Sequence, residues 1–309
     1  MKTLRSSHAK VGVGRLCELF GKTRHAYYDK NWFIDERLRS TEIVLEMVAE
    51  IRREIPRIGT RKLYYMLEKP MKDNGIKMGR DMLHALLLDY GLTVKHRKRY
   101  IRTTNSFHWM KKYPNLVKSL VITQPEMVWV SDITYILVAE GFNFLSLITD
   151  VYSKQIMGYC LFPTLHSEGA INALKMALNR RTLPHSNLIH HSDRGTQYCC
   201  ADYVALLNQA EIGISMTEKG DPYENAIAER VNGILKQDFN LSREFPNRKQ
   251  ALLEVEKSIT AYNELRPHMS CAYLTPTEAH RTNGTLEKKW KPKIYMKKIP
   301  DLIELPSTS

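Results

Sequence analysis

The stretch from residue 127 to residue 162 most constrains the fold, because it contains three β-rich runs in quick succession. The runs cover 127–138, 142–149 and 156–162, and turn-forming residues separate them. Runs rich in β-branched and aromatic residues between such turns are typical of strands joined as hairpins. The pattern therefore predicts three neighbouring antiparallel strands.

The segment after residue 162 alternates between helices and strands. Apolar spacing predicts helices over 167–181 and about 201–210, and short apolar runs predict strands over 187–191 and 212–216. Three meandering strands followed by such an alternation are typical of a mixed sheet covered by helices. The sequence thus predicts an α/β domain with a mixed five-stranded sheet and flanking helices.

Three carboxylates occur on three different elements of this predicted domain. Asp132 lies within the first strand, Asp193 follows the apolar run at 187–191, and Glu229 lies within a later helix. The 35 residues between Asp193 and Glu229 leave room for a helix, an edge strand and a loop. A carboxylate such as Asp132 in an apolar run is costly to bury without a partner. The three acids are therefore predicted to share one metal site.

Other polar residues nearby have structural interpretations. Glu224 falls at the expected start of a helix, where the helix dipole favours an acid. Asp150 opens a turn, and we expect it to cap that turn rather than bind metal. One of His190 and His191 either orients the loop before Asp193 or is a buried structural histidine.

Charge is divided unevenly along the chain, whose net charge is +13. Residues 1–118 hold 26 Lys and Arg against 12 Asp and Glu, residues 119–283 hold 14 against 18, and residues 284–309 hold 6 against 3. This division is expected if a basic front half binds a polyanion and the core holds carboxylates for a metal. A solvated basic surface is the alternative.

The basic front half is predicted to be all-α. Residues 11–30 fit two short helices around a turn at Gly21, a helix-turn-helix, although a simple packing unit explains the pattern equally well. Residues 41–94 contain three predicted helices, and the last one carries Arg80 and His84 on its outer side, like a recognition helix. A helical bundle packed on the core is the alternative for this second unit.

Basic and aromatic residues alternate over 95–118, between the helices and the sheet. The segment is interpreted as a linker whose cations neutralise phosphates and whose rings, including Tyr113, stack on bases. The candidate DNA contacts here are Arg97, Lys98 and Arg99. A merely solvated linker is the alternative.

Secretion and membrane insertion have no signal in the sequence. No apolar run approaches the roughly 18 residues of a membrane span, and the N-terminus lacks the apolar stretch of a signal peptide. The five cysteines form no Cys-x-x-Cys motif, so we expect reduced thiols and a cytoplasmic protein.

Four motifs in the second half resemble those of a known family. They are Trp129-x-x-Asp132-x-Thr134-Tyr135, His191-Ser192-Asp193-Arg194-Gly195-x-Gln197-Tyr198, Glu224-Asn225-Ala226-x-Ala228-Glu229-Arg230 and Tyr262-Asn263-x-x-Arg266-Pro267-His268. In this order they are similar to the catalytic chain of bacterial insertion-sequence transposases, which belong to the retroviral-integrase superfamily. The closest group is the orfB type, which moves by a copy-out, paste-in route. The resemblance covers about residues 120–280 and, more loosely, the helical front half.

The resemblance implies a ribonuclease H-like core in which Asp132, Asp193 and Glu229 form an acidic triad. Such a triad binds two Mg²⁺ ions, with Mn²⁺ as a substitute, because hard divalent ions prefer oxygen ligands and two of them stabilise both the attacking and the leaving oxygen. Water first frees a 3′-hydroxyl, and that hydroxyl then attacks a second phosphodiester. The resemblance also implies that Lys236, seven residues after Glu229, contacts DNA near the cleaved phosphate.

The expected partners are double-stranded DNA, as element ends and as target, and further copies of this chain. Joining needs two DNA segments near one active site, so we expect a homodimer or higher oligomer on DNA, associated with the bacterial nucleoid. An upstream-frame helix-turn-helix partner or fusion is a further candidate.

A ribonuclease H-like nuclease or resolvase and a non-catalytic DNA-binding repressor are the alternative functions. The predicted organisation is a helix-turn-helix segment at 1–40, a helical DNA-binding domain at 41–94, a basic linker at 95–118, a catalytic core at 119–283 and a basic tail at 284–309.

Overall fold

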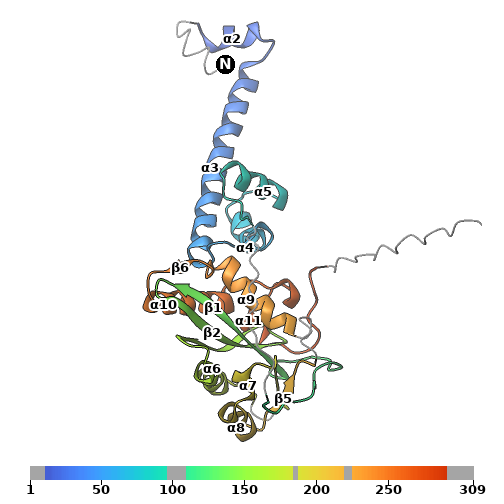
Figure 1. Ribbon diagram of the computed structural model, residues 1–309. Coiled ribbons are helices and arrows are strands. Elements are labelled where there is room, and N and C mark those ends of the chain that lie inside the picture. Colours follow the sequence, from blue (N-terminus) through green and yellow to red (C-terminus); the bar gives the residue numbers. More distant parts are fainter. Residues whose placement is uncertain (1–10, 96–108, 184–186, 219–224, 291–309) are drawn as a thin grey trace, which may run out of the picture.

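The structure is a computed structural model that describes residues 11–95, 109–183, 187–218 and 225–290 of the chain. A helical arm stands on a globular α/β core (Figure 1). No helix within these ranges is long and apolar enough to cross a membrane. The predicted positions outside the described residues are Arg97, Lys98, Arg99, Glu224 and the tail from residue 291 onwards.

A mixed sheet forms the centre of the core. Its order is β3-β2-β1-β4-β5, with β1, β2 and β3 antiparallel and with β4 and β5 parallel to β1. This confirms the predicted meander and the two later strands. A two-residue strand, β6, also pairs with β1, and it escaped prediction because two residues carry no periodic pattern. The strands are β1 (Val128–Val138), β2 (Gly141–Asp150), β3 (Ile156–Phe162), β4 (Ile189–Ser192), β5 (Gly213–Met216) and β6 (Glu244–Phe245).

Helices cover both faces of the sheet (Figure 1). One apolar cluster, which contains Trp129 and Leu174, lies under α6 and α8, and another, which contains Leu145 and Val255, lies under α9 and α10. Full burial of each such side chain contributes about 1.5–3 kcal/mol. This is the ribonuclease H-like arrangement that the sequence predicts. The helices are α6 (Ser167–Asn179), α7 (Thr196–Cys199) and α8 (Ala201–Gln209) on one side, and α9 (Ala226–Asp238), α10 (Arg248–Glu264) and α11 (Pro276–Ala279) on the other.

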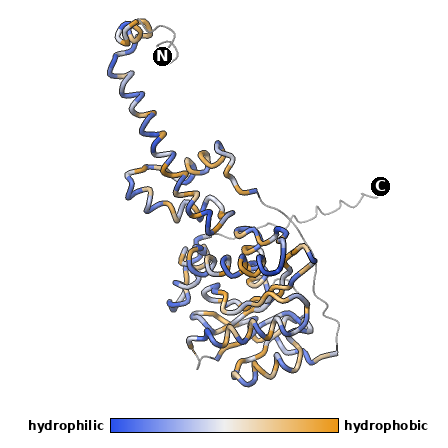
Figure 2. Tube along the Cα trace, turned by 90° about the vertical axis from the view of Figure 1, so that its left-hand side faces the viewer, coloured by the Kyte–Doolittle hydropathy of each residue, from blue (hydrophilic) through white to orange (hydrophobic). Residues whose placement is uncertain are grey.

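The arm begins with two helices joined by a short turn, in which Gly21 has a φ of 62°. Thr23 caps the second helix, since its hydroxyl accepts a hydrogen bond from the Ala26 N–H at 3.1 Å. That helix, α3, then runs unbroken to Glu54, and its upper part stands clear of the core (Figure 2). The division predicted between residues 40 and 41 therefore falls inside one helix, because no Gly or Pro interrupts the chain there. The arm helices are α2 (Val13–Leu19), α3 (Arg24–Glu54), α4 (Thr60–Asp73) and α5 (Arg80–Asp89).

The lower part of the arm packs on the core. Val48, Leu63 and Leu87 of the arm belong to the same apolar cluster as the residues beneath α9 and α10. Tyr65 of α4 also stacks on Tyr273, with ring centroids 4.4 Å apart. The helical unit at 41–94 thus has the packing that the alternative interpretation expects, while the outer face of α5 stays exposed.

Residues 109–118, predicted as part of a linker, lie against the edge of the sheet. The Met216 N–H donates a hydrogen bond to the Pro114 carbonyl at 3.3 Å. The Tyr113 ring packs against the apolar cluster under α6 and α8 and is partly buried. This part of the predicted linker therefore lies on the core, through a backbone contact about a hundred residues away in sequence, where a local pattern gives no indication of it. The stacking of Tyr113 on a base stays a prediction.

Candidate active site

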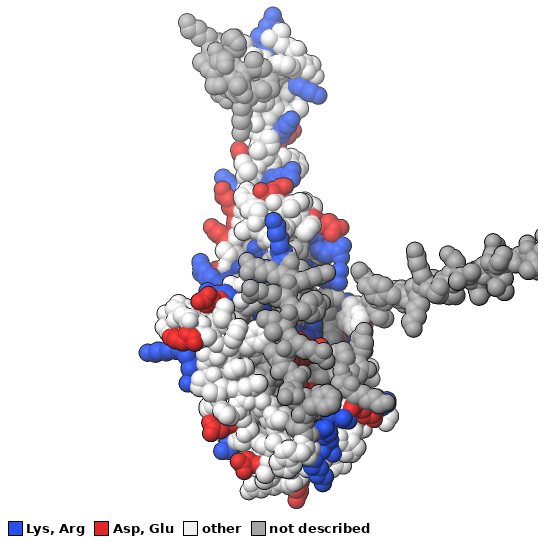
Figure 3. Space-filling view, in the orientation of Figure 1, with Lys and Arg blue, Asp and Glu red and all other residues white. Residues whose placement is uncertain are grey.

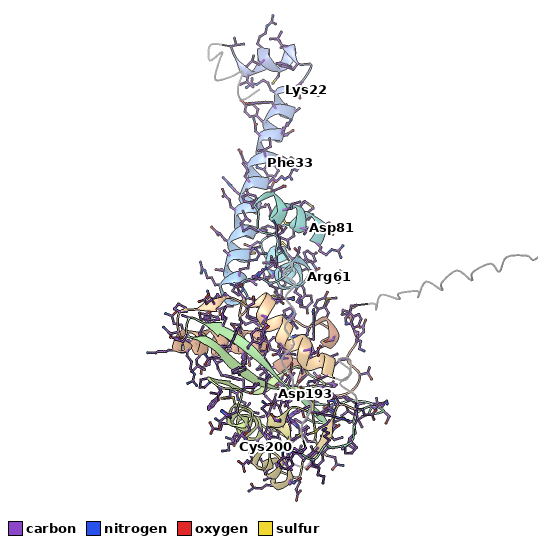
Figure 4. The ribbon with its side chains drawn as sticks, in the orientation of Figure 1. Lys22, Phe33, Arg61, Asp81, Asp193 and Cys200 are labelled. Carbon is purple, nitrogen blue, oxygen red and sulfur yellow. The ribbon has the colours of Figure 1, made fainter. Side chains whose placement is uncertain are left out.

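Asp132 and Asp193 lie side by side because β1 and β4 are parallel neighbours. Ser131 of β1 pairs with Ser192 of β4, so the next residue on each segment is an aspartate. β4 ends at Ser192 whereas β1 continues to Val138, so no strand pairs with this edge of β1 between Asp132 and the start of the β6 pairing at Leu137. Adjacent strands are about 4.8 Å apart, so this register brings two carboxylates to one place (Figure 4 labels Asp193).

The two aspartates line a pocket of about 100 Å³, which we call the aspartate pocket. Asp132 Oδ2 accepts a hydrogen bond from Asn232 Nδ2 of α9 at 2.7 Å. Asp193 Oδ1 accepts one from the Gly195 N–H at 2.9 Å. A Cβ on Gly195 would lie 3.0 Å from that same oxygen, so the loop needs a glycine for this close approach. Tyr135 and Tyr198 form part of the remaining wall.

Burial raises the pKa of both aspartates. Burial, then the charge of Asp193, raise the pKa of Asp132 to about 7, while the Asn232 hydrogen bond opposes the shift and the charge of Glu229 adds to it. Burial raises the pKa of Asp193, and the hydrogen bond from Gly195 opposes that shift. Adjacent carboxylates with raised pKa values are sites where a divalent cation relieves like-charge repulsion.

Helix α9 holds Glu229 over β1. Asn225, just before the helix, donates a hydrogen bond from Nδ2 to the Ser131 carbonyl at 3.0 Å, and Asn232 donates to Asp132. Glu229 lies between them at spacings of four and three residues, on the same side of the helix. Its side chain is exposed and does not line the aspartate pocket. Among the described residues, no three His, Cys, Asp or Glu side chains lie close enough to bind one ion.

Two of the three predicted ligands are therefore brought together, and the third lies on the adjacent helix within electrostatic range of Asp132. The donors are all oxygen atoms, which suits Mg²⁺ or Mn²⁺. The Tyr198 hydroxyl, in the wall of the aspartate pocket, is buried and has no hydrogen-bond partner in the part of the chain that the structure describes. Buried hydroxyls are normally hydrogen-bonded, so this hydroxyl is expected to bond to a water or to an ion-bound oxygen. The site thus fits a hydrated divalent ion.

Asn232 and Tyr198 have no assigned role in the sequence analysis. Asn232 is buried on α9 beside the apolar residues Val231 and Ile234. A polar residue at a buried helix position is the signal that could have indicated Asn232. Tyr198 ends one of the four motifs, but only the folded structure shows that it lines the same pocket as the aspartates.

We expect Asn232→Leu to lower metal-dependent turnover about 10–100-fold, because it removes the amide that fixes a metal-binding carboxylate. The concentration of Mg²⁺ needed for half-maximal DNA cleavage should rise as well. Asn208→Leu, at an exposed position of α8, is the matched control. An Asn232→Leu chain with the metal dependence of that control would contradict the assignment.

Asp150 caps its turn, as predicted. Its Oδ1 accepts hydrogen bonds from the N–H and the hydroxyl of Ser153, both at 2.7 Å. Its Oδ2 accepts one from the Glu126 N–H, also at 2.7 Å. The carboxylate is fully buried and faces away from the aspartate pocket, so its role is structural.

His190 and His191 are buried structural residues. His190 Nε2 lies 2.6 Å from the Ser131 hydroxyl and 2.8 Å from the Tyr203 hydroxyl. Burial, then the neighbouring His191, lower the pKa of His190 to about 3, so the ring is neutral at physiological pH. His191 Nδ1 lies 2.8 Å from the Ser215 hydroxyl. Both rings tie β4 to its neighbouring strands.

Lys236 lies beside the aspartate pocket. Its ammonium group is 3.9 Å from the centroid of the Tyr135 ring, which forms part of the pocket wall. Burial lowers the pKa of Lys236 to about 8, with the charge of Asp132 opposing the shift. A cation–π contact therefore holds the lysine near the aspartates. Its contact with DNA stays a prediction.

Arg80 and His84 are exposed on α5, but both have local partners. Arg80 Nη2 lies 2.9 Å from Asp81 Oδ1, and His84 Nδ1 lies 3.4 Å from the Thr60 hydroxyl. A DNA phosphate would compete with Asp81 for the arginine. The role of Arg80 and His84 in reading DNA stays a prediction.

The fold and the aspartate pocket define a core of the integrase type. Two family models, each described as "Integrase core domain", match residues 122–222 and 210–276. The chain is 37% identical over 265 residues to the insertion element IS600 uncharacterized 31 kDa protein of Shigella sonnei, covering 84% of this chain and 96% of that protein. It is 33% identical over 201 residues to transposase InsF for insertion sequence IS3A of Escherichia coli K12, covering 64% and 69%.

The transposase for insertion sequence element IS629 of Shigella sonnei is 27% identical over 288 residues, covering 91% of this chain and 95% of that protein. Among solved structures, the HTLV-2 integrase catalytic core domain in complex with magnesium has a TM-score of 0.41 and 19% identity, covering 51% of this chain and 98% of that one. The chain belongs to the IS3 family of insertion-sequence transposases. It is accordingly a DNA transposase of the polynucleotidyl transferase superfamily that has an integrase core, rather than a repressor or a resolvase.

Proposed function

We propose that Asp132, Asp193 and Glu229 hold two divalent ions, Mg²⁺ or Mn²⁺, with which the chain cleaves and joins the ends of its insertion sequence. The observation that supports this most is the pairing of β1 with β4, which puts two aspartates in one pocket. Glu229, tethered on both sides by asparagines that bond to β1, supplies the third carboxylate once a cation offsets the repulsion among the acids.

The bound ions would supply Lewis-acid stabilisation of the attacking and leaving oxygens. The residues of the chain position the ions and the DNA. Asp132 and Asp193 hold the ions and so set where cleavage occurs, and Asn232 orients Asp132. The unpaired Tyr198 hydroxyl donates a hydrogen bond to a water or phosphate oxygen in the pocket. Lys236 holds the DNA backbone. No covalent intermediate with the protein is needed, because a water and then the freed 3′-hydroxyl are the nucleophiles.

An end-cleavage and joining assay tests this function. The purified chain is incubated with duplexes that carry the flanking ends of the element, in Mg²⁺, in Mn²⁺ or in EDTA. We expect free 3′-hydroxyl ends and joined products with either ion and neither product in EDTA. Cleavage without any joining would instead favour a nuclease, and joining in EDTA would contradict the metal assignment.

The proposed active form contains at least two copies of the chain on the terminal repeats of the element. Joining one end to another strand requires two DNA segments near one active site, and two-fold assembly is the commonest way to hold them. Light scattering with and without end DNA tests this. A single chain per complex throughout the reaction would contradict it.

A further inference from the structure

A groove lies between α4 of the arm and α9 of the core. Two cavities, of about 570 Å³ and about 650 Å³, have Lys62, Arg230 and Ile234 in common in their walls. They therefore adjoin, and we call them together the interdomain groove. It follows α9 from Ala226 to Gln237, and Lys236 lines it close to the aspartate pocket.

The interdomain groove is strongly basic, with nine Lys and Arg side chains in its walls against one carboxylate. Lys and Arg side chains are visible at the level where the arm meets the core (Figure 3), and Arg61 is labelled there in Figure 4. An excess of one charge in a concave surface attracts ligands of the opposite charge. The first cavity is lined by Arg57, Lys62, Lys95, Arg230, Lys236 and the carboxylate of Asp238. The second adds Arg61, Lys154, Arg266 and Lys288.

Arg266 and His268 of the motif Tyr262-Asn263-x-x-Arg266-Pro267-His268 line the buried floor of the second cavity, and the transposase function gives this motif no role. Arg266 is only 1% exposed, and its Nε and Nη2 donate hydrogen bonds to Asp238 Oδ2 at 2.9 and 2.8 Å. The same carboxylate oxygen lies 3.9 Å from the ammonium group of Lys62. One carboxylate oxygen therefore serves two cations. No other carboxylate of the described residues lines the groove, although the charges of Asp150 and Asp132 act on Lys154 and Lys236 from outside it.

Arg61 and Arg230 are the groove cations best placed for an external anion. Both are exposed, and neither makes a hydrogen bond or an ion pair with any residue that the structure describes. Both line the second cavity, Arg61 from α4 of the arm and Arg230 from α9 of the core. The charge of each also helps to lower the pKa of Lys62 to about 8, after burial and Arg266, which places both near the buried floor.

We propose that the interdomain groove binds the phosphodiester backbone of duplex DNA and guides it toward Lys236 and the aspartate pocket. The inference rests on the proposed function for the identity of the polyanion. It adds a DNA-binding surface that exists only while the arm is packed on the core. Cations distributed over both cavities suit a chain of phosphates, whereas a small anion would occupy one part of the groove only.

The test compares two double variants with the same loss of charge. Arg61→Gln/Arg230→Gln removes two cations from the groove, and Lys175→Gln/Lys249→Gln removes two from exposed positions on α6 and α10. Binding of an unrelated duplex and of an element-end duplex is measured at several salt concentrations in EDTA. The groove variant should weaken both duplexes to a similar extent and should lower the slope of log affinity against log salt by about 2 relative to the control. Equal affinity and equal slope in the two variants would overturn the proposal.

Inorganic phosphate provides the second arm of the test. If phosphate raises the melting temperature of the parent chain but not of the groove variant, while the variant and the control bind DNA equally, the groove is a small-anion site and the proposal is wrong. Circular dichroism melting of both variants confirms that each is folded. Binding in EDTA involves no cleavage, so the comparison of the groove variant with the control does not depend on the triad. An Asp132→Asn chain that still cleaved DNA would refute the triad but would not change that comparison.

Discussion

Asp132→Asn is expected to reduce end cleavage and strand transfer to the level measured in EDTA, with DNA binding nearly unchanged. The substitution keeps the shape of the side chain and its contact with Asn232 but removes the charge that holds a cation. Gel shifts in EDTA and cleavage assays in Mg²⁺ measure the two properties separately. Asp202→Asn, at an exposed position of α8, is the matched control. Near-normal turnover of Asp132→Asn would show that the metal assignment is wrong.

Asp193→Asn and Glu229→Gln should have the same effect, but they test different parts of the structure. Asp193 already lines the pocket with Asp132, whereas Glu229 lies outside it on α9. Calorimetric titration with Mn²⁺ distinguishes the two cases. Full activity and unchanged Mn²⁺ binding in Glu229→Gln would restrict the metal site to the two aspartates.

The sheet was predictable from sequence because its signals are local. The β-rich runs at 127–138, 142–149 and 156–162 each sit between turn residues, and each forms a strand within two residues of the expected bounds. The adjacency of Asp132 and Asp193 was not a local signal. It was predicted from three acids on three elements and supported by the resemblance to transposases, but the physical cause, the parallel pairing of β1 with β4, became visible only in the fold.

Long-range contacts account for what the sequence could not predict. The hydrogen bond from the Met216 N–H to the Pro114 carbonyl and that from Asn232 to Asp132 both join residues about a hundred positions apart. The continuity of α3 across residues 40 and 41 was missed for a different reason. Its buried residues are Tyr27 near one end and Val44 and Val48 near the other, so no buried apolar residue marks the stretch that joins them.

A second prediction with a large expected effect concerns a cluster of buried charged side chains around Glu126 in the core. Glu126 is fully buried and accepts hydrogen bonds from the N–H and hydroxyl of Thr182, at 2.7 and 2.8 Å, and from the Leu183 N–H at 2.9 Å. His280 Nε2 lies 3.4 Å from Glu126, and His280 Nδ1 lies 3.8 Å from Asp150. The cluster links the chain before β1, the end of α6 and the end of α11. Arg181 Nε also lies 3.6 Å from Glu126 Oε2. Removing one partner from a buried ion-pair cluster typically costs about 3–5 kcal/mol.

The pKa values of Glu126 and His280 are shifted in opposite directions, so the cluster stabilises the folded chain over a defined pH range. Burial alone would raise the pKa of Glu126, but hydrogen bonds from His280, Thr182 and Leu183 lower it to about 2. Its contribution to stability is present above the usual pKa of 4.5 and is lost as the pH falls toward 2. Burial alone would lower the pKa of His280, but hydrogen bonds to Asp150 and Glu126 raise it to about 9. Its contribution is complete below the usual pKa of 6.5 and is lost as the pH rises through 9.

We therefore expect His280→Asn to lower the free energy of unfolding by roughly 3 kcal/mol below pH 6.5 and by much less above pH 9. Urea denaturation across that range measures the difference. The parent chain should lose stability between these pH values, and the variant should show a flatter profile because asparagine cannot carry the proton. His166→Asn, at an exposed position before α6, should follow the parent. A parent profile that is flat over the same range, or a variant that parallels it, would mean that His280 is not charged in the folded protein.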